Sequence, residues 1–152
     1  MSYYDILQLA GAKGRSIDLM ARLKSSDYAL LADFRYVLRQ FLAFSENRAA
    51  ALGLAPQQHQ ALLAIKGFAG APTVGDLARR LVVRHNSAVG LVNRLVAAKL
   101  VDRCSDEADR RRASLVLTRR GEAILARLTA AHRQELRRIS KPLQKLLVTL
   151  GE

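Results

Sequence analysis

The chain has 152 residues, half of them hydrophobic, so it is long enough to fold as one domain around its own core, and a disordered protein is excluded. Its net charge of +12 favours a polyanionic partner. The single cysteine, Cys104, excludes an intrachain disulfide framework and fits a reducing compartment, and no apolar run approaches the roughly 20 residues of a membrane span. We therefore expect a cytoplasmic protein that does not contact a membrane.

The first part of the chain predicts two helices after an extension. Residues 1–25 have a weak amphipathic pattern interrupted by glycines, and they form either an ordered helical extension or a flexible arm. From Ser26, which can cap a helix, apolar residues recur at helical spacing to about residue 50. A second helix is predicted to begin at Pro56, because proline is favoured in the first helical turn.

The next two segments have the pattern of a helix-turn-helix. Thr73, followed three residues later by Asp76, is a capping arrangement for a short helix. After a short connection, the stretch HNSAVGLVNRLVAAKL predicts a second helix that begins with small polar residues. Asn86 and Ser87 stand where this helix begins, so each is either a base-reading side chain or the N-cap.

A β-hairpin is predicted directly after this helix pair, in the position of a wing. VDRCS and ASLVLT are the two strand-like segments, and DEADRRR forms a polar tip between them. Residues 76–120, which include the helix pair and the hairpin, hold 11 Lys or Arg against 5 Asp or Glu. Because three consecutive arginines repel one another, we expect a partner outside the chain to meet them, and a solvated charge cluster is the alternative.

The C-terminal part predicts more helix. A long helix opens at Gly121, and Pro142 breaks or restarts it before a last amphipathic segment. The first and last helices of the chain carry apolar stripes that a compact winged unit cannot cover entirely. We infer that these helices pair with a second copy of the chain, and the alternative is that they pad the core of one chain.

Together these elements predict a mainly α fold with a small β-hairpin wing. A winged helix-turn-helix domain is flanked by N- and C-terminal dimerisation helices. We expect one domain over residues 26–152. Within it, residues 54–120 form the winged helix-turn-helix part, and residues 26–53 and 121–152 form the dimerisation helices.

The stretch LVDRCSDEADRRRASLVLTRRGEAIL, residues 100–125, resembles the wing signature of the MarR family of bacterial transcriptional regulators. LAPQQHQALLAI is similar to the family's second helix, and TVGDLARRL and LVNRL match its helix-turn-helix. The resemblance covers nearly the whole chain, so the expected domain is MarR-like. It implies a dimeric winged-helix repressor or activator, often responsive to small phenolic or lipophilic molecules that bind between the dimerisation helices and the winged domain.

The second helix of the pair is the expected recognition helix. Its candidate DNA-binding residues are Arg84, His85, Asn86, Ser87, Gly90, Asn93 and Arg94. We expect Arg84 and Arg94 to hold phosphates, because a guanidinium offers several donors to phosphate oxygens. Gly90 departs from the pattern of many family members, which carry an arginine there, and a glycine cannot make that contact. Base readout is therefore expected to shift to His85, Asn86, Ser87 and Asn93.

The wing supplies the second set of candidate DNA-binding residues, which are Asp109, Arg110, Arg111 and Arg112. Arg111 matches the family's wing arginine, which is expected to enter the minor groove, where A·T-rich sequences concentrate negative potential. Asp109 is expected to orient Arg111, or the hairpin, through a charge-assisted hydrogen bond.

Effector-binding and catalytic residues are much less defined. Tyr36, Arg39 and His59 are candidate effector-binding residues, although His59 is expected at the surface. Cys104 is expected to pack as a small apolar side chain. The three histidines share no metal-ligand spacing with it, and no phosphate-loop, dinucleotide-fold or hydrolase motif appears. We therefore expect no metal, no cofactor and no enzymatic activity.

The sequence thus predicts a sequence-specific regulator of transcription that binds double-stranded DNA as a homodimer. We expect a near-palindromic operator and a ligand-responsive repressor. Two other classes stay open. A non-specific architectural DNA-binding protein would bind operator and random DNA alike and lose nearly all of its binding in salt. A winged domain that binds another protein would not need the three arginines of the wing.

Overall fold

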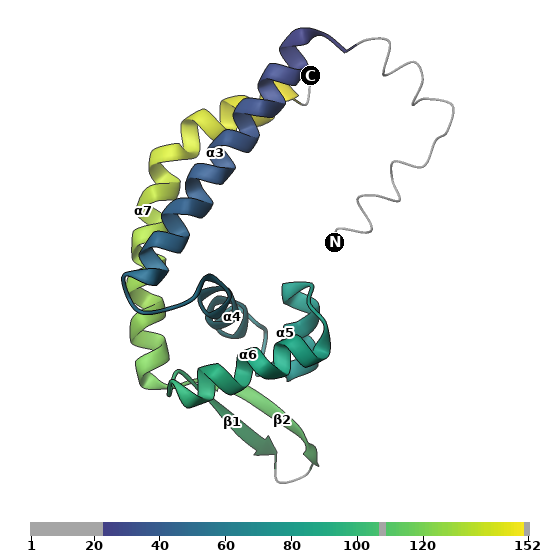
Figure 1. Ribbon diagram of the computed structural model, residues 1–152, viewed down its shortest axis with the longest axis vertical. Coiled ribbons are helices and arrows are strands. Elements are labelled where there is room, and N and C mark those ends of the chain that lie inside the picture. The colour runs from purple at the N-terminus through teal and green to yellow at the C-terminus, as the bar shows by residue number, and fades with distance from the viewer. Residues whose placement is uncertain (1–22, 107–108, 151–152) are drawn as a thin grey trace, which may run out of the picture. The chain divides into compact units, whose positions relative to one another are not determined.

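The computed structural model describes residues 23–106 and 109–150, and the side chains of residues 23–104 and 113–149 (Figure 1). Its elements, in chain order, are α3 (Ser25–Ala50), α4 (Pro56–Lys66), α5 (Val74–Leu81), α6 (His85–Ala97), β1 (Val101–Asp106), β2 (Asp109–Leu117) and α7 (Arg119–Leu150). The prediction of a mainly α fold with a small β-hairpin is therefore confirmed. Most of the extension predicted over residues 1–25 lies outside the described residues.

The chain divides into two units, and the apolar core belongs to one of them. One unit consists of residues 1–38 and 141–152, and the other of residues 39–140. The core residues of the second unit come from the end of α3 through the first half of α7, and they are Ala49, Leu54, Ala61, Leu62, Ile65, Leu77, Leu91, Val92, Leu95, Leu100, Val101, Leu115, Leu125 and Leu128. The helix-turn-helix and the hairpin therefore pack around one shared core.

The two helices that precede the recognition helix begin as the sequence predicts. Pro56 is the first residue of α4, and the Gln58 side chain accepts a hydrogen bond of 2.9 Å from the amide of Ala55. At the start of α5, the Thr73 hydroxyl accepts from the amide of Asp76 at 3.2 Å, and the Asp76 carboxylate accepts from the amide of Thr73 at 2.8 Å. This reciprocal capping satisfies amides that a helix start otherwise leaves without partners.

The hairpin differs from the sequence prediction at its distal end. Its strands are antiparallel, and the pairing is regular from Val101 opposite Leu117 to Ser105 opposite Ala113. The register then shifts, so that Asp106 pairs with Asp109. The segment from Asp109 to Arg112 is therefore part of β2 and not of a tip, because the ladder resumes beyond the irregularity. The three arginines lie within β2, between Asp109, which pairs with Asp106, and Ala113, which pairs with Ser105.

Two contacts hold the base of the hairpin against the rest of its unit. The amide of Leu115 donates to the carbonyl of Pro72 at 2.8 Å, which joins β2 to the segment before α5. The amide of Thr118 donates to the carbonyl of Leu100 at 3.0 Å, and its hydroxyl caps α7 by accepting from the amide of Gly121 at 3.0 Å. The hairpin therefore leaves the core from a fixed base.

The ends of the two longest helices differ from their predicted places. The helix α3 begins at Ser25, and the Asp27 carboxylate, rather than Ser26, accepts from the amide of Lys24 at 2.7 Å. The helix α7 continues through Pro142. The prediction of a break was wrong: the φ of proline suits a helix, and neither the missing amide donor nor the crowding of the carbonyl four residues earlier ends α7 here.

We predict that Gly121→Ala destabilises the protein by about 3 kcal/mol, because a Cβ at this position would lie well inside van der Waals contact with the carbonyl oxygen of Leu100. Gly90→Ala is the matched control. A Cβ on Gly90 would meet only the guanidinium of Arg94, at 3.6 Å, so alanine should stabilise α6 by about 1 kcal/mol. Urea denaturation of both variants measures the difference. Equal midpoints for Gly121→Ala and the wild type would contradict the close approach to Leu100.

Candidate nucleic-acid interface

The turn between α5 and α6 is short and strained. Its first residue, Val82, has a left-handed φ of 55° and is 87% exposed. This conformation costs a β-branched residue on the order of 1–2 kcal/mol. The turn is closed by hydrogen bonds from the amide of Val82 to the Arg79 carbonyl at 3.2 Å and from the amide of Val83 to the Ala78 carbonyl at 3.0 Å. It sets the direction in which α6 leaves α5.

One face of α6 is buried and the other is exposed. The buried residues are Ala88, Leu91, Val92 and Leu95, which recur at helical spacing. Of the predicted DNA-binding residues, Arg84, His85, Asn86, Ser87, Asn93 and Arg94 are exposed, and Gly90 is half-buried. The predicted recognition residues therefore lie off the core-facing stripe, where a partner can reach them.

The start of α6 decides between the two interpretations of its polar residues. Arg84 is the N-cap and makes no side-chain capping bond, and His85 is the first helical residue. Asn86 and Ser87 are therefore inside the first turn, and the interpretation of either as the N-cap was wrong. Both side chains are exposed at the end of the helix that a major groove accommodates.

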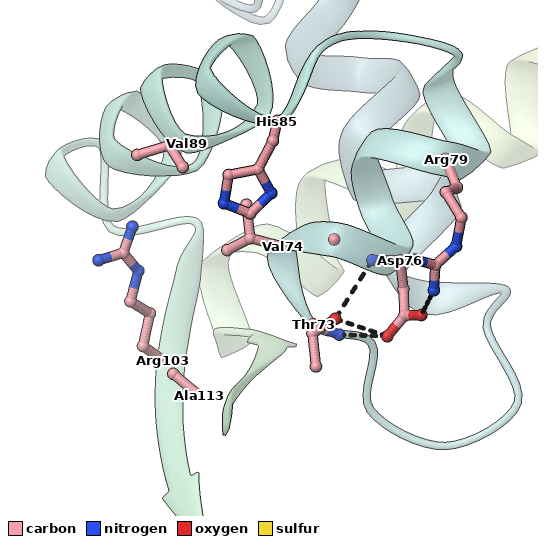
Figure 2. Close-up of a pocket in the computed structure, with 9 residues that line it drawn as sticks. Thr73, Val74, Asp76, Arg79, His85, Val89, Arg103 and Ala113 are labelled. Carbon is pink, nitrogen blue, oxygen red and sulfur yellow. Dashed lines mark hydrogen bonds and ion pairs between the residues drawn. The ribbon is translucent and has the colours of Figure 1, made fainter. Parts of the chain in front are cut away.

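Two hollows flank α6. One, of about 490 Å³, is lined by residues of α4, the end of α5, the turn and α6, namely Gln57, Gln60, Leu81, Val83, Asn86, Ser87, Gly90, Leu91 and Arg94. The other, of about 610 Å³, lies between α6, the start of α5 and the hairpin, and we call it the wing crevice. It is lined by Thr73, Val74, Gly75, Asp76, Arg79, His85, Val89, Arg103 and Ala113 (Figure 2).

The α5 wall of the wing crevice is a hydrogen-bonded ion pair. Asp76 accepts from Thr73 and forms an ion pair with Arg79 (Figure 2). The backbone amide and the hydroxyl of Thr73, followed by the guanidinium of Arg79, hold the pKa of Asp76 below its usual range. Asp76 is therefore ionised at neutral pH, and it neutralises Arg79.

The hairpin wall of the wing crevice carries Arg103, which belongs to the wing signature but is not among the predicted DNA-binding residues. Arg103 lies on β1 and donates to the side-chain oxygen of Asn93 on α6 at 2.7 Å. No described carboxylate forms an ion pair with Arg103. A pairing between residues 93 and 103 of two different elements has no local sequence signal. Only the docking of the hairpin beside α6 brings them together.

The candidate wing residues lie further out along the same hairpin. Asp109, Arg110, Arg111 and Arg112 belong to β2, and their side chains lie outside the described ones. The expected orientation of Arg111 by Asp109 therefore stays a prediction. The three arginines lie on a hairpin whose base is joined by hydrogen bonds to the helix-turn-helix (Figure 1).

The sequence model of the MarR family matches residues 52–112, which run from the start of α4 through the helix-turn-helix into β2. Over residues 52–112, the chain is similar to the MarR family. Members of the family are transcription regulators, and the MarR-family segment contains both the recognition helix and most of the wing. No curated protein matches the chain.

Solved structures share the fold of this chain. A single-residue mutant of S. aureus MepR, bound to an oligodeoxyribonucleotide, is 21% identical, with a TM-score of 0.65 over 81% of this chain and 97% of that one. RV1404 from Mycobacterium tuberculosis is 27% identical, with a TM-score of 0.63 over 84% and 80% of the two chains. Apo MarR from E. coli is 22% identical, with a TM-score of 0.62 over 76% and 92%.

The three candidate effector-binding residues have different surroundings. Tyr36 and Arg39 are exposed on α3. The expectation of a surface position for His59 was wrong, because His59 is only 6% exposed. Its ring lies 4.8 Å from that of His132 on α7.

His132 is itself fixed by two hydrogen bonds. Its Nδ1 donates to the Leu128 carbonyl at 2.6 Å, and its Nε2 lies 2.7 Å from the hydroxyl of Ser45. The edges of Phe41 and Phe44 pack on the same ring. The two imidazoles therefore lie next to each other, and the rings of Phe41 and Phe44 pack against that of His132. This cluster has no sequence motif, because its members come from α3, α4 and α7.

Cys104 also differs from its prediction. It is exposed on β1, so the expected apolar packing role was wrong. Strand alternation places it on the face opposite to that of the core residue Val101. Over the described residues, no three His, Cys, Asp or Glu side chains gather into a group that could hold a metal ion. None of the described helices is both long and apolar enough to cross a membrane.

We predict that the stability of the protein falls in mild acid through His59. Burial, followed by the charge of His132, lowers the pKa of His59 from 6.5. The unfolded chain then binds the proton more readily than the folded one. The stabilisation is therefore complete above about pH 6.5 and is lost as the pH falls through the folded pKa. His59→Gln should flatten this slope in urea denaturation between about pH 5 and 8.

His85→Gln is the matched control, because it removes an exposed histidine of α6 and should keep the slope of the wild type. His132 faces His59, and the guanidinium of Arg48 lies 5.2 Å from the neighbouring Phe44 ring, and both side chains are present in either variant. An unchanged slope in His59→Gln would assign the acid sensitivity to other groups.

Proposed function

We propose that this MarR-like chain binds a specific double-stranded DNA operator as a homodimer and represses transcription there. The observation that carries the proposal is the exposed polar and basic face of α6 beside a hairpin with three consecutive arginines. A helix of this kind suits the major groove, and a basic hairpin suits the adjacent minor groove. The oligodeoxyribonucleotide in the MepR structure supports the same kind of partner.

Sequence-specific binding is supported by the residue types at the start of α6. Asn86 can pair with adenine through two hydrogen bonds, and Ser87 can bond a base or a phosphate. Arg84 and Arg94, both exposed, flank them as phosphate-binding residues. Gly90 leaves the hollow beside it open, so base readout falls to the polar residues around it.

Homodimerisation is supported by the long helices. The large apolar side chains exposed on α3 and α7 are Tyr28, Leu31, Tyr36, Leu38, Leu42, Leu136, Leu147 and Val148. A single soluble chain rarely leaves so many of these in water. A second copy of the chain would cover them and would place two recognition helices about 34 Å apart, in successive major grooves.

The effector is the least specified part of the proposal. A small phenolic or lipophilic molecule would bind near Tyr36, Arg39 or His59 and release the operator. Release requires the effector to bind the DNA-free conformation more tightly than the DNA-bound one.

Selection of bound fragments from a random DNA library, at near-physiological salt, tests the proposal. We expect a short inverted repeat with half-sites about one helical turn apart, because two symmetric recognition helices read equivalent sequences. Binding without any recovered motif would instead favour the architectural alternative, with its strong salt dependence. Absence of DNA binding would favour the protein-binding alternative.

We predict that Arg111→Ala weakens binding to the selected operator by about 1–3 kcal/mol, the range of a groove contact. Arg127→Ala is the matched control, since it removes an exposed arginine of α7 and should change affinity little. Fluorescence anisotropy measures both affinities, and circular dichroism confirms the fold. If both variants bind like the wild type, the wing does not contact the operator.

A further inference from the structure

We infer that the wing crevice receives the sugar–phosphate strand that separates the major groove from the minor groove. In this arrangement Arg103 is a phosphate-binding residue, and Asn93 is a positioning residue that holds Arg103. The inference rests on the proposed function, in which α6 enters the major groove and the hairpin enters the adjacent minor groove. It adds Arg103 to the interface and gives Asn93 a role other than base readout.

The place of the crevice follows from the geometry of DNA. Two adjacent grooves of a duplex are divided by one sugar–phosphate strand. A protein with one element in each groove must therefore leave room for that strand between the two elements. The wing crevice, of about 610 Å³, lies between α6 and the hairpin. His85 on α6 and Arg103 on β1 line it from its two walls (Figure 2).

The two arginines of the crevice differ in what they can offer to a phosphate. Arg79 already forms an ion pair with Asp76. Arg103 pairs with no described carboxylate, and it donates one hydrogen bond of 2.7 Å to Asn93. A guanidinium has five N–H donors, so the others stay available for phosphate oxygens. Arg103 is therefore the cation of the crevice that is suited to bind the strand.

The contact with Asn93 also settles the orientation of its amide. Arginine is a donor only, so the atom that it meets must be the amide oxygen. The oxygen of Asn93 is thus directed to the wing, whereas bidentate pairing with adenine needs both the oxygen and the NH₂ group. A held arginine loses less side-chain freedom when it binds a phosphate, so Asn93 strengthens binding through Arg103.

The base of the crevice is held in place by backbone contacts. Thr73, before α5, pairs with Ser114 of β2 through an isolated β-bridge. The neighbouring hydrogen bond from the amide of Leu115 to the carbonyl of Pro72 is 2.8 Å long. The hairpin wall therefore keeps its place relative to α5, and the contact between Arg103 and Asn93 joins it to α6.

The test measures binding of the full-length protein to the selected operator and to a random duplex over a range of salt concentrations. Arg103→Gln should weaken binding to both duplexes by about tenfold, because a phosphate contact carries no sequence information. The slope of log K against log salt should become shallower by about 0.9, the value for one phosphate. Arg103→Lys keeps the charge and should restore the slope. Arg127→Gln makes the same charge change on α7 and should leave the slope unchanged.

Asn93→Ala tests the positioning role separately. It should weaken binding to both duplexes by the same factor and leave the base preference of the selected motif unchanged. Added to Arg103→Gln, it should cause no further loss, because the two residues act through one contact. Thermal unfolding of each variant confirms the fold.

Three results would overturn the inference, and they are distinguishable. Equal salt slopes for Arg103→Gln and Arg127→Gln would exclude Arg103 as a phosphate-binding residue. A changed base preference in Asn93→Ala would make Asn93 a base reader. Failure of the wild-type protein to bind either duplex would remove the proposed function itself. In the first two cases the proposed function stands.

Discussion

Burial of one face of α6 is the constraint on which the rest of the interface depends. Ala88, Leu91, Val92 and Leu95 lie in the core, and α4, α5 and β1 pack around them. With these side chains inside, the rotation of the helix about its axis is set. Asn86, Ser87 and Asn93 must then face outward. The polar face of α6 is therefore exposed to solvent, where a partner can reach it.

The hairpin depends on the same core. Leu115 is a core residue of β2, and the hydrogen bond from its amide to the carbonyl of Pro72 holds the strand beside the start of α5. At the other end of the base, Gly121 lets α7 begin against the carbonyl of Leu100, where a side chain would not fit. The like charges on the distal part of the hairpin repel one another, and the contacts near its base keep the hairpin in place despite this repulsion. A cluster of arginines can therefore extend from a stable domain and meet a polyanion.

The ionisable groups of the crevice and those of the core have different neighbours. At the crevice, Asp76 neutralises one arginine, whereas Arg103 is held by an uncharged amide and keeps its full attraction for an anion. Inside the unit, the rings of His59 and His132 lie 4.8 Å apart, and burial favours a neutral His59. The crevice thus presents an arginine without a described carboxylate partner, while the interior contains a group whose protonation opposes folding.

The sequence by itself determined the elements, their order and the likeness to the MarR family. Helical periodicity, the Thr73–Asp76 cap, Pro56 and the arginine run are local signals, and each acts through neighbours a few residues away along the chain. For the same reason it predicted a helix break at Pro142, since a proline disfavours a helix locally, whereas α7 continues through it. The tertiary structure alone decided which residues meet across elements. It paired Arg103 with Asn93, buried His59 against His132 and exposed Cys104, because these outcomes depend on how the helices and the hairpin pack around one core and not on spacing along the chain.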